Sequence, residues 1–206
     1  MRKLIVSTFL TLDGVMQAPG GPGEDDDRGF AYGGWSVNYW DEQMGQVMGE
    51  AMSTPFDLLL GRRTYDIFAA YWPHAPEEAG AKPLNDATKY VASRTHRALD
   101  WGPSVLIEGD AAEGVAKLKQ GDGSELQVHG SGNLIQTLLQ HGLIDEYRLW
   151  VFPPRDRLGQ AAVRRRHDPS RTEARRQQGL DDRRCDRHVR ARRRGHHRLL
   201  LTRPTA

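Results

Sequence analysis

Short apolar runs alternate with amphipathic segments along the first three quarters of the chain. The runs are rich in Leu, Ile and Val, as is typical of buried strands. In the amphipathic segments apolar residues recur at spacings of three and four, which predicts helices; Met44, Val47 and Met48 share one face in this way. Strands that alternate with helices predict an α/β domain with a mainly parallel sheet flanked by helices. The expected strands are residues 4–10, 57–60, 90–92, 105–108, 126–129 and 147–152, and the expected helices are residues 41–52, 63–71, 111–119 and 133–141.

A long segment, residues 18–39, interrupts this alternation and is rich in Gly, Pro and acidic residues. Loops of this length in compact domains usually carry function or are disordered. Trp35 lies within the segment and Trp40 follows it, which favours a loop that folds over another part of the chain.

Composition and charge divide the 206 residues into two parts, with the boundary after Pro153. Residues 154–206 hold 17 arginines, six acidic residues and no lysine, a net charge of +11, whereas residues 1–153 carry −9. This tail also lacks Ile, Phe, Tyr, Trp and Met, so we expect it to be largely unstructured and the sheet to end near Pro153. The 38% of hydrophobic residues in the whole chain nevertheless excludes a wholly disordered protein.

Cysteine usage and apolar run length indicate a cytoplasmic protein. Cys185 is the single cysteine, so no intramolecular disulfide can form, which fits a reducing compartment. No apolar stretch approaches the ~20 residues of a membrane span. Polar residues such as Ser7 and Asp13 interrupt the basic, apolar start, so we expect a first strand there in place of a signal peptide.

Three of the expected strands end in residues suited to binding a phosphorylated ligand. Open α/β sheets bind ligands beyond the carboxyl ends of their strands, free helix N–H groups attract anions, and arginine pairs bidentately with phosphate. The strand ends read LLLGRRTY at 58–65, VASRT at 91–95 and LQVHGSGNL at 126–134. Taken singly, they also fit a surface arginine pair on a capped helix, a polar turn and a tight turn. Because the third lacks the full Gly-x-Gly-x-x-Gly spacing and the P-loop lysine, neither a standard dinucleotide fingerprint nor a nucleotide triphosphatase is supported.

In combination these segments resemble the dihydrofolate reductase-like superfamily, in particular its bacterial branch related to the reductase domain of riboflavin biosynthesis. The resemblance spans about residues 1–153 and includes IVSTFLTLDGVM, LLLGRRTYDIFAAYWP, KYVASRTH and LQVHGSGNLIQTLLQHGLIDEYRLWVFP. It implies a mainly parallel sheet and a cytoplasmic enzyme that binds NADPH and transfers a hydride to a small heterocyclic or conjugated substrate. It also implies a homodimer for an intact member of the family.

The resemblance assigns cofactor contacts to the three strand ends. The first would contact the cofactor phosphates, the second the adenosine 2′-phosphate, which favours NADPH over NADH, and the third would cradle the pyrophosphate. Dihydrofolate reductases carry three consecutive glycines at the third turn, where this chain has Ser131 in the middle. The residues implied are Gly61, Arg62, Arg63 and Thr64, then Ser93 and Arg94, then Gly130, Ser131, Gly132, Asn133 and Leu134.

The proton donor implied by the resemblance lies on the helix after the first loop, where this chain has Asp41 and Glu42. A carboxyl beside Trp40 would have a raised pKa and could serve as the catalytic acid. Alternatively, both acids are solvated in the first turn of a helix, where the macrodipole favours them.

The arginine-rich tail admits three interpretations. A nucleic-acid-binding arm would place many guanidinium groups on phosphates, but it would usually mix lysine with arginine. A zinc site that includes Cys185 and His188 lacks a second cysteine pair, so we expect no metal. A frameshift is favoured, since GC-rich DNA read out of frame tends to encode arginine without lysine. Deleting one nucleotide from a permitted set of codons for residues 154–160 yields P-V-I-G-S-G, followed by apolar strands, a turn and lysines.

We therefore interpret residues 1–153 as a dihydrofolate reductase-like NADPH-binding domain whose last strands are missing, and residues 154–206 as a frameshift-derived tail. The expected partner is a small-molecule substrate, with no membrane or nucleic acid, and loss of the last strands would weaken any homo-oligomer. Two alternative functions remain: an α/β domain with a basic nucleic-acid-binding arm, and a cofactor-binding protein without efficient catalysis.

Overall fold

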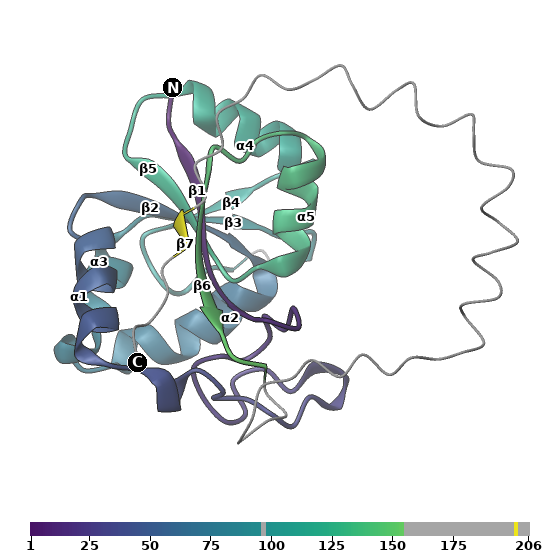
Figure 1. Cartoon of the computed structure of the whole chain (residues 1–206). Helices are drawn as coiled ribbons and strands as arrows, with labels where there is room; N and C mark the ends of the chain where they lie inside the picture. The colour runs from purple at the N-terminus through teal and green to yellow at the C-terminus, as the bar shows by residue number, and fades with distance from the viewer. Residues whose placement is uncertain (96–97, 155–199, 202–206) are drawn as a thin grey trace, which may run out of the picture. The chain divides into compact units, whose positions relative to one another are not determined.

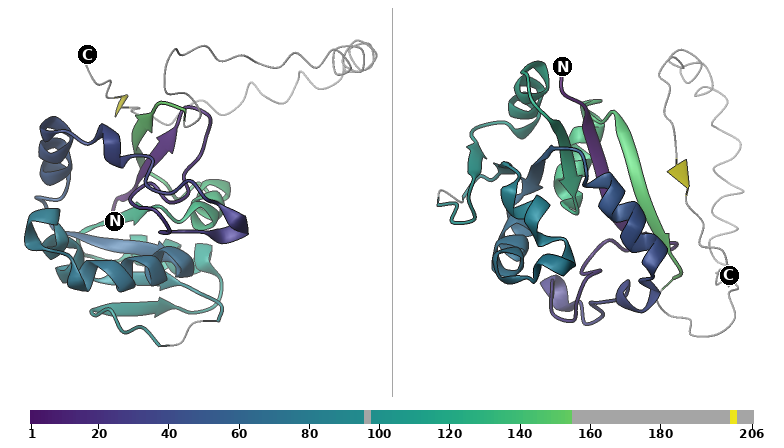
Figure 2. Two further views of the ribbon diagram at one scale, coloured as in Figure 1. Left: turned by 90° about the horizontal axis from the view of Figure 1, so that it is seen from below. Right: turned by 90° about the vertical axis from the view of Figure 1, so that its left-hand side faces the viewer.

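The apolar runs of the sequence form the strands of one parallel sheet, in the order β4-β3-β2-β5-β1-β6-β7. The structure, a computed structural model, describes residues 1–95, 98–154 and 200–201. β1 lies between β5 and β6, as the right-hand view of Figure 2 shows. The strands are β1 (Leu4–Thr11), β2 (Phe56–Gly61), β3 (Lys89–Ala92), β4 (Ser104–Ile107), β5 (Glu125–His129), β6 (Glu146–Phe152) and β7 (Leu200–Leu201). The predicted parallel α/β architecture and all six predicted strands are confirmed.

Helices cover both faces of this sheet (Figure 1). On one face α4 and α5 pack on Leu4, Val6 and Val128, and on the other α2 and α3 pack on Leu58 and Leu60. The α-helices of the described residues are α1 (Glu42–Ala51), α2 (Arg62–Tyr71), α3 (Ala81–Asp86), α4 (Ala111–Gln120) and α5 (Gly132–Gln140), with short 3-10 turns η1 (Asp27–Gly29), η2 (Val37–Tyr39), η3 (Trp72–His74) and η4 (Glu77–Ala79). The four predicted helices are confirmed. α3 was not predicted, because its six residues include Pro83 and are too few for an amphipathic period. None of the described helices is both long and apolar enough to cross a bilayer.

The sheet does not end near Pro153, contrary to our expectation. Leu200 and Leu201 pair in parallel with Arg148 and Leu149 of β6. An edge strand offers unpaired backbone groups, and a run of leucines in the tail favours pairing with them. The average composition of the tail hides this short run, so the prediction missed it. The other predictions for the tail concern residues 155–199 and 202–206, which lie outside the described residues.

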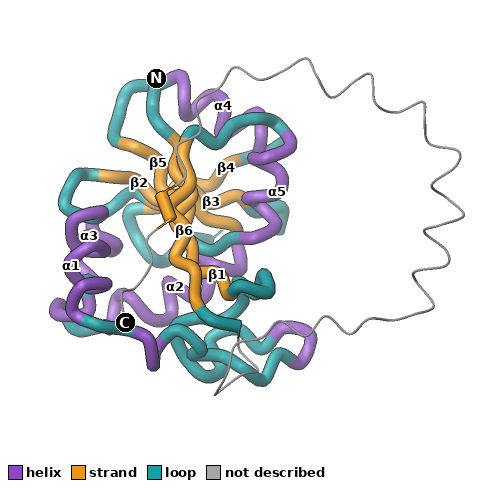
Figure 3. Tube along the Cα trace, in the orientation of Figure 1, coloured by secondary structure: helices purple, strands orange, loops and turns teal. Residues whose placement is uncertain are grey.

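The long loop between β1 and α1 folds back onto the end of β6. The Trp35 ring is buried, its centroid lies 5.4 Å from that of Phe152, and its Nε1–H donates to the Gln17 carbonyl at 2.8 Å. Tyr39 and Phe9 also contact the Phe152 ring edge-on, at 5.9 and 5.4 Å. Figure 3 shows this loop in teal at the lower edge of the molecule. The prediction of a loop that folds over another segment is therefore confirmed, with Phe152 as its anchor.

Candidate functional site

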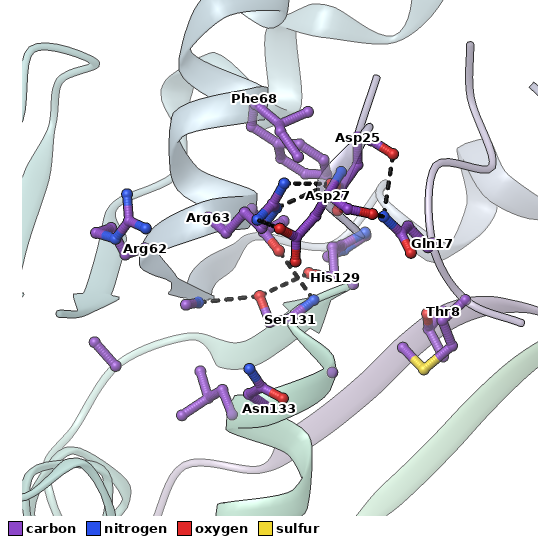
Figure 4. Close-up of a pocket in the computed structure, with 18 of the residues that line it drawn as sticks. Thr8, Gln17, Asp25, Asp27, Arg62, Arg63, Phe68, His129, Ser131 and Asn133 are labelled. Atoms are coloured by element: carbon purple, nitrogen blue, oxygen red, sulfur yellow. Dashed lines mark hydrogen bonds and ion pairs between the residues drawn. The ribbon is translucent and has the colours of Figure 1, made fainter. Parts of the chain in front are cut away.

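The carboxyl ends of β1, β2, β3 and β5 border one cavity of about 850 Å³ (Figure 4). This follows from topology, because neighbouring parallel strands all end at the same edge of the sheet. The volume lies within the range of ~300–1,000 Å³ that is typical of small-molecule sites. All eleven residues predicted to contact a cofactor line this cavity: Gly61, Arg62, Arg63, Thr64, Ser93, Arg94, Gly130, Ser131, Gly132, Asn133 and Leu134.

Ser131 joins two of these strand ends. Its hydroxyl oxygen accepts a hydrogen bond from the Gly61 N–H at 3.0 Å, and its own N–H donates to the Thr64 hydroxyl at 3.0 Å. Gly130 and Ser131 both adopt the left-handed conformation, with φ of 56° and 58°, which turns the chain from β5 into α5. A serine is strained in this conformation, whereas a glycine is not. The hydroxyl at this position thus holds the ends of β2 and β5 together.

The N-termini of α2 and α5 reach the cavity without a side-chain cap. Within the described residues, neither Gly61 before α2 nor Ser131 before α5 accepts a capping hydrogen bond through its side chain. In contrast, Asp41 caps α1 and Asp110 caps α4. Backbone N–H groups of an uncapped first turn seek an external acceptor, and the helix dipole favours an anion there. Two helices therefore offer donors to an anionic ligand in the same cavity.

The arginines of the cavity differ in their present partners. The Arg63 guanidinium contacts Asp25 at 2.6 Å and Asp27 at 3.2 Å, as Figure 4 shows. Arg62 pairs with Asp66, one turn along α2, at 2.7 Å. Arg94 follows β3, is exposed, and has no ion-pair partner within the part of the chain that the structure describes. Arg28 also lines the cavity and lies 4.0 Å from Asp27. A phosphate would thus meet one arginine without a carboxylate partner and three that it must share with carboxylates.

An acidic segment, residues 24–27, holds the long loop against the mouth of the cavity. The Gln17 side-chain amide donates to the carbonyl oxygens of Asp25 and Asp27, both at 3.1 Å. The Glu24 carboxylate accepts from the N–H groups of Gly20 and Gly21, and burial raises the pKa of Glu24. We did not assign these acids a role from the sequence, although a run of four acids opposite two arginines was a usable signal.

Asp41 and Glu42, which the resemblance implies as catalytic acids, are not brought into the cavity, and that role stays a prediction. Neither lines it, and the Asp41 carboxylate accepts the Met44 N–H at 2.8 Å as the N-cap of α1. Both residues are exposed in the first turn, which is where the helix macrodipole stabilises acids. The alternative interpretation of these two residues therefore fits the structure.

The inner wall of the cavity includes side chains that the sequence did not single out. Ser7 and Phe9 come from β1, Met48 from α1 and His129 from β5. Burial, followed by the charge of Arg148, lowers the pKa of His129 to about 4, so its imidazole is neutral near neutral pH. His129 lies within the segment LQVHGSGNL, but from the sequence we assigned a binding role only to the Gly-rich turn that follows it.

One family model and two curated proteins match this chain. Residues 2–178 match the model of the RibD C-terminal domain, a span that extends beyond Pro153. The uncharacterised protein YyaP of Bacillus subtilis (strain 168) is 30% identical over 156 residues, which cover 74% of this chain and 75% of YyaP. The uncharacterised protein YwjB of the same organism is 24% identical over 155 residues, which cover 74% of this chain and 77% of YwjB.

Two solved structures are also similar. One is described as a candidate riboflavin biosynthesis protein from Shewanella sp. PV-4, with a TM-score of 0.48 and 21% identity over 74% of this chain and 77% of that one. The other is dihydrofolate reductase from Enterococcus faecalis in complex with NADP(H) and RAB-propyl, with a TM-score of 0.43 and 16% identity over 74% of this chain and 71% of that one.

Proposed function

The chain belongs to the RibD C-terminal domain family, and on this premise we propose that it is a dihydrofolate reductase-like, NADPH-dependent reductase of a small heterocyclic or conjugated compound. When bound, NADPH would supply the hydride. The residues of this chain would bind the cofactor, orient the substrate beside it and exclude water from the inner wall of the cavity.

The observation that carries the proposal is the convergence of three separate strand ends on one cavity. The residues there suit a dinucleotide phosphate, because the uncapped N-termini of α2 and α5 present backbone donors from two directions. Gly61 and Gly130 bring backbone close to the cavity without side chains. The cavity thus offers donors for a pyrophosphate independently of its arginines.

Ser93 and Arg94 support the choice of NADPH over NADH. Both follow β3 and line the cavity. The guanidinium of Arg94 carries a full charge and can pair bidentately with a phosphate monoester. An adenosine ribose that carries a 2′-phosphate would gain this contact, whereas one that carries a hydroxyl would not.

A second function, cofactor binding without efficient turnover, is favoured by one specific observation. The Asp41 carboxylate that was expected to donate a proton instead caps α1 and does not line the cavity. A binding-only protein would hold NADPH with normal affinity and oxidise it slowly with every substrate offered.

The nucleic-acid alternative rests on the arginine-rich tail, most of which lies outside the described residues. It requires DNA binding that weakens steeply with added salt.

The test uses the full-length chain in fluorescence titrations with NADPH and NADH, followed by assays of NADPH oxidation with a panel of heterocyclic and conjugated carbonyl compounds. We expect saturable NADPH binding, weaker NADH binding, and turnover with at least one compound. Equal affinities for both cofactors would contradict the role of Arg94, and an absence of NADPH binding would contradict the proposal as a whole.

A further inference from the structure

The long loop between β1 and α1 has a closed neck and a polar tip. Two backbone hydrogen bonds close the neck, from the Gly34 N–H to the Ala18 carbonyl at 2.8 Å and from the Ser36 N–H to the Pro19 carbonyl at 3.1 Å. All of the tip, residues 20–33, lies in the described part of the chain, and none of its residues is buried. Segments with few buried apolar contacts open at a low cost in free energy, so the tip is the part of the loop that opens most easily.

Ion pairs with Arg63 hold the tip against the start of α2. Asp25 Oδ1 accepts from Arg63 Nε at 2.9 Å and lies 2.6 Å from Nη2, while Asp27 Oδ1 lies 3.2 Å from Nη1 (Figure 4). The Asp25 side chain is only 16% exposed in this arrangement. Asp26, between the two, is exposed, does not line the cavity and forms no ion pair within the described residues. Two of three consecutive acids thus contact one guanidinium, and the third does not.

The two carboxylates occupy the donors that a phosphate group would use. Arg63 lines the cavity in the first turn of α2, which has no side-chain cap. A guanidinium pairs bidentately with a carboxylate or with a phosphate through the same fork of N–H groups. Here all three of its nitrogens face the oxygens of Asp25 and Asp27. The acidic tip and a phosphate therefore compete for one guanidinium.

The closed tip also holds one residue in an unfavourable backbone conformation. Arg28, which follows Asp27, has φ of 55° and ψ of 28°, in the left-handed region that residues other than glycine rarely adopt. Its side chain is almost fully exposed, so packing of that side chain does not stabilise the conformation. Such a conformation persists only where neighbouring contacts impose it, and the ion pairs of Asp25 and Asp27 are contacts of this kind.

Resting on the reductase function proposed above, we propose that the tip is an autoinhibitory latch, which Asp25 and Asp27 close on Arg63 and which the pyrophosphate group of the cofactor opens. The phosphate takes the guanidinium, and the two carboxylates lose their counter-charge and face a second anion, so the tip moves away from α2. A ligand without such a group offers Arg63 no replacement partner and leaves the latch closed. The latch thus favours ligands that carry a pyrophosphate.

Hydrogen exchange of the full-length protein, followed by mass spectrometry, tests the movement. Ligand binding ordinarily slows exchange, because it stabilises the bound state, so the latch predicts a change of the opposite sign at the tip. We expect NADPH, and inorganic pyrophosphate at constant ionic strength, to slow exchange in residues 130–134. Both should speed exchange in residues 20–33 by a factor of about two to thirty, which corresponds to the loss of two surface ion pairs. Slower or unchanged exchange at the tip with either ligand bound would overturn the proposal.

Asp25→Asn and Asp26→Asn are a matched pair of variants, because they remove the same charge from neighbouring residues. Asparagine keeps an oxygen for the Asp27 N–H, which donates to Asp25 Oδ1 at 3.1 Å, so the local turn is preserved. Asp25→Asn should speed exchange of the tip without any ligand, and a ligand should then add less. Arg63→Leu breaks the same pair from the other side and should also speed it. If Asp26→Asn has the effect of Asp25→Asn, the charge of the segment and not the pair with Arg63 holds the tip, and the proposal is wrong.

NADPH titrations of the wild type separate this proposal from the proposed function. If NADPH binds and exchange at the tip becomes faster, both proposals are supported. If NADPH binds while exchange at the tip slows or stays constant, the latch is wrong and the reductase function stands. If pyrophosphate speeds exchange at the tip but NADPH does not bind, the tip is a latch that an anion opens, and the reductase function fails. If neither ligand binds, both proposals fail.

Discussion

The Ser131 hydroxyl accepts a 3.0 Å hydrogen bond from the backbone N–H of Gly61, although the two residues are 70 positions apart in the sequence. This bond and the one between the Ser131 N–H and Thr64 hold two strand ends in register at the candidate phosphate site. A glycine at the same turn has no hydroxyl and could not accept the hydrogen bond from Gly61.

Removing this hydroxyl should destabilise the protein. Ser131→Ala leaves the Gly61 N–H without its acceptor and keeps the left-handed strain, so we expect a loss of about 1–3 kcal/mol in the free energy of unfolding. Ser131→Gly loses the same bond but relieves the strain, which is about 1–2 kcal/mol for a non-glycine residue. Urea denaturation should therefore rank the glycine variant above the alanine variant. The reverse order would show that the left-handed backbone conformation at this position costs little, and an alanine variant as stable as the wild type would show the same of the lost hydrogen bond.

Neutralising the acidic segment should tighten cofactor binding. In Asp25→Asn/Asp27→Asn the Arg63 guanidinium is released from two carboxylates and becomes available to a phosphate. Ion pairs at a protein surface are worth about 0.2–1 kcal/mol each, so the loss of two should raise NADPH affinity by a factor of about two to thirty. The gain should shrink as salt is added. Asp86→Asn, which breaks the exposed pair with Lys82 outside the cavity, is the control and should change nothing.

Arg94 should decide between the two nicotinamide cofactors. Arg94→Ala removes the cavity arginine that has no carboxylate partner in the described structure, so we expect NADPH affinity to fall about tenfold or more, as a charge-assisted bond of ~1.5–3 kcal/mol implies. NADH affinity should stay nearly constant, which makes NADH the internal control of the titration. A parallel loss for both cofactors would place Arg94 away from the 2′-phosphate.

Stability should fall at acidic pH because of His129. Its pKa is about 4 in the folded protein, since burial disfavours the imidazolium, while the unfolded chain takes up the proton near its ordinary pKa. The unfolded state therefore binds more protons below about pH 6.5, and stability declines as the pH falls from there toward about pH 4. Between about pH 7 and pH 4.5 the loss from this group is about 2–3 kcal/mol.

Comparison with His129→Phe isolates this contribution from that of the carboxylates. Urea denaturation at both pH values should show a smaller pH-dependent loss in the variant than in the wild type. If the two proteins lose equal stability on acidification, His129 is not held neutral by burial.

The coding DNA should reveal whether the arginine-rich tail arose by frameshift. We expect resequencing across the codons for residues 152–160 to show one additional nucleotide relative to a frame that encodes P-V-I-G-S-G after the strand that ends at Phe152. A chain with the frame restored should unfold at a higher temperature, because longer apolar strands would then cover the edge of β6, which β7 pairs only at Arg148 and Leu149. Independent reads that support the present frame would contradict this interpretation and make the tail a genuine part of the protein.

Elements built from local patterns could be predicted from the sequence. Leu58, Leu59 and Leu60 form a continuous apolar run, and all three are fully buried in β2 as such a run predicts. Asp41 shows the limit of local reasoning: helix capping and proton donation both suit an acid at that position, and only the bond to Met44 decides between them. The pairing of Arg63 with Asp25 joins residues 38 positions apart, and no local pattern specifies which acid meets which base. β7 was missed for a related reason, since its pairing depends on an edge that another segment leaves open.

Phe152 anchors the cavity loop through Trp35 and Tyr39, and it also stands one residue before the end of the region that we attribute to the domain. Its carbonyl accepts the Leu12 N–H at 2.9 Å, so the same residue holds the start of the loop as well. A protein or a purification tag inserted after Pro153 would be attached next to Phe152 and would displace it most directly. We therefore expect a fusion at this junction to disturb the contacts of Phe152 that hold the long loop at the mouth of the cavity. A tag at Met1, at the opposite end of β1, should leave these contacts unchanged.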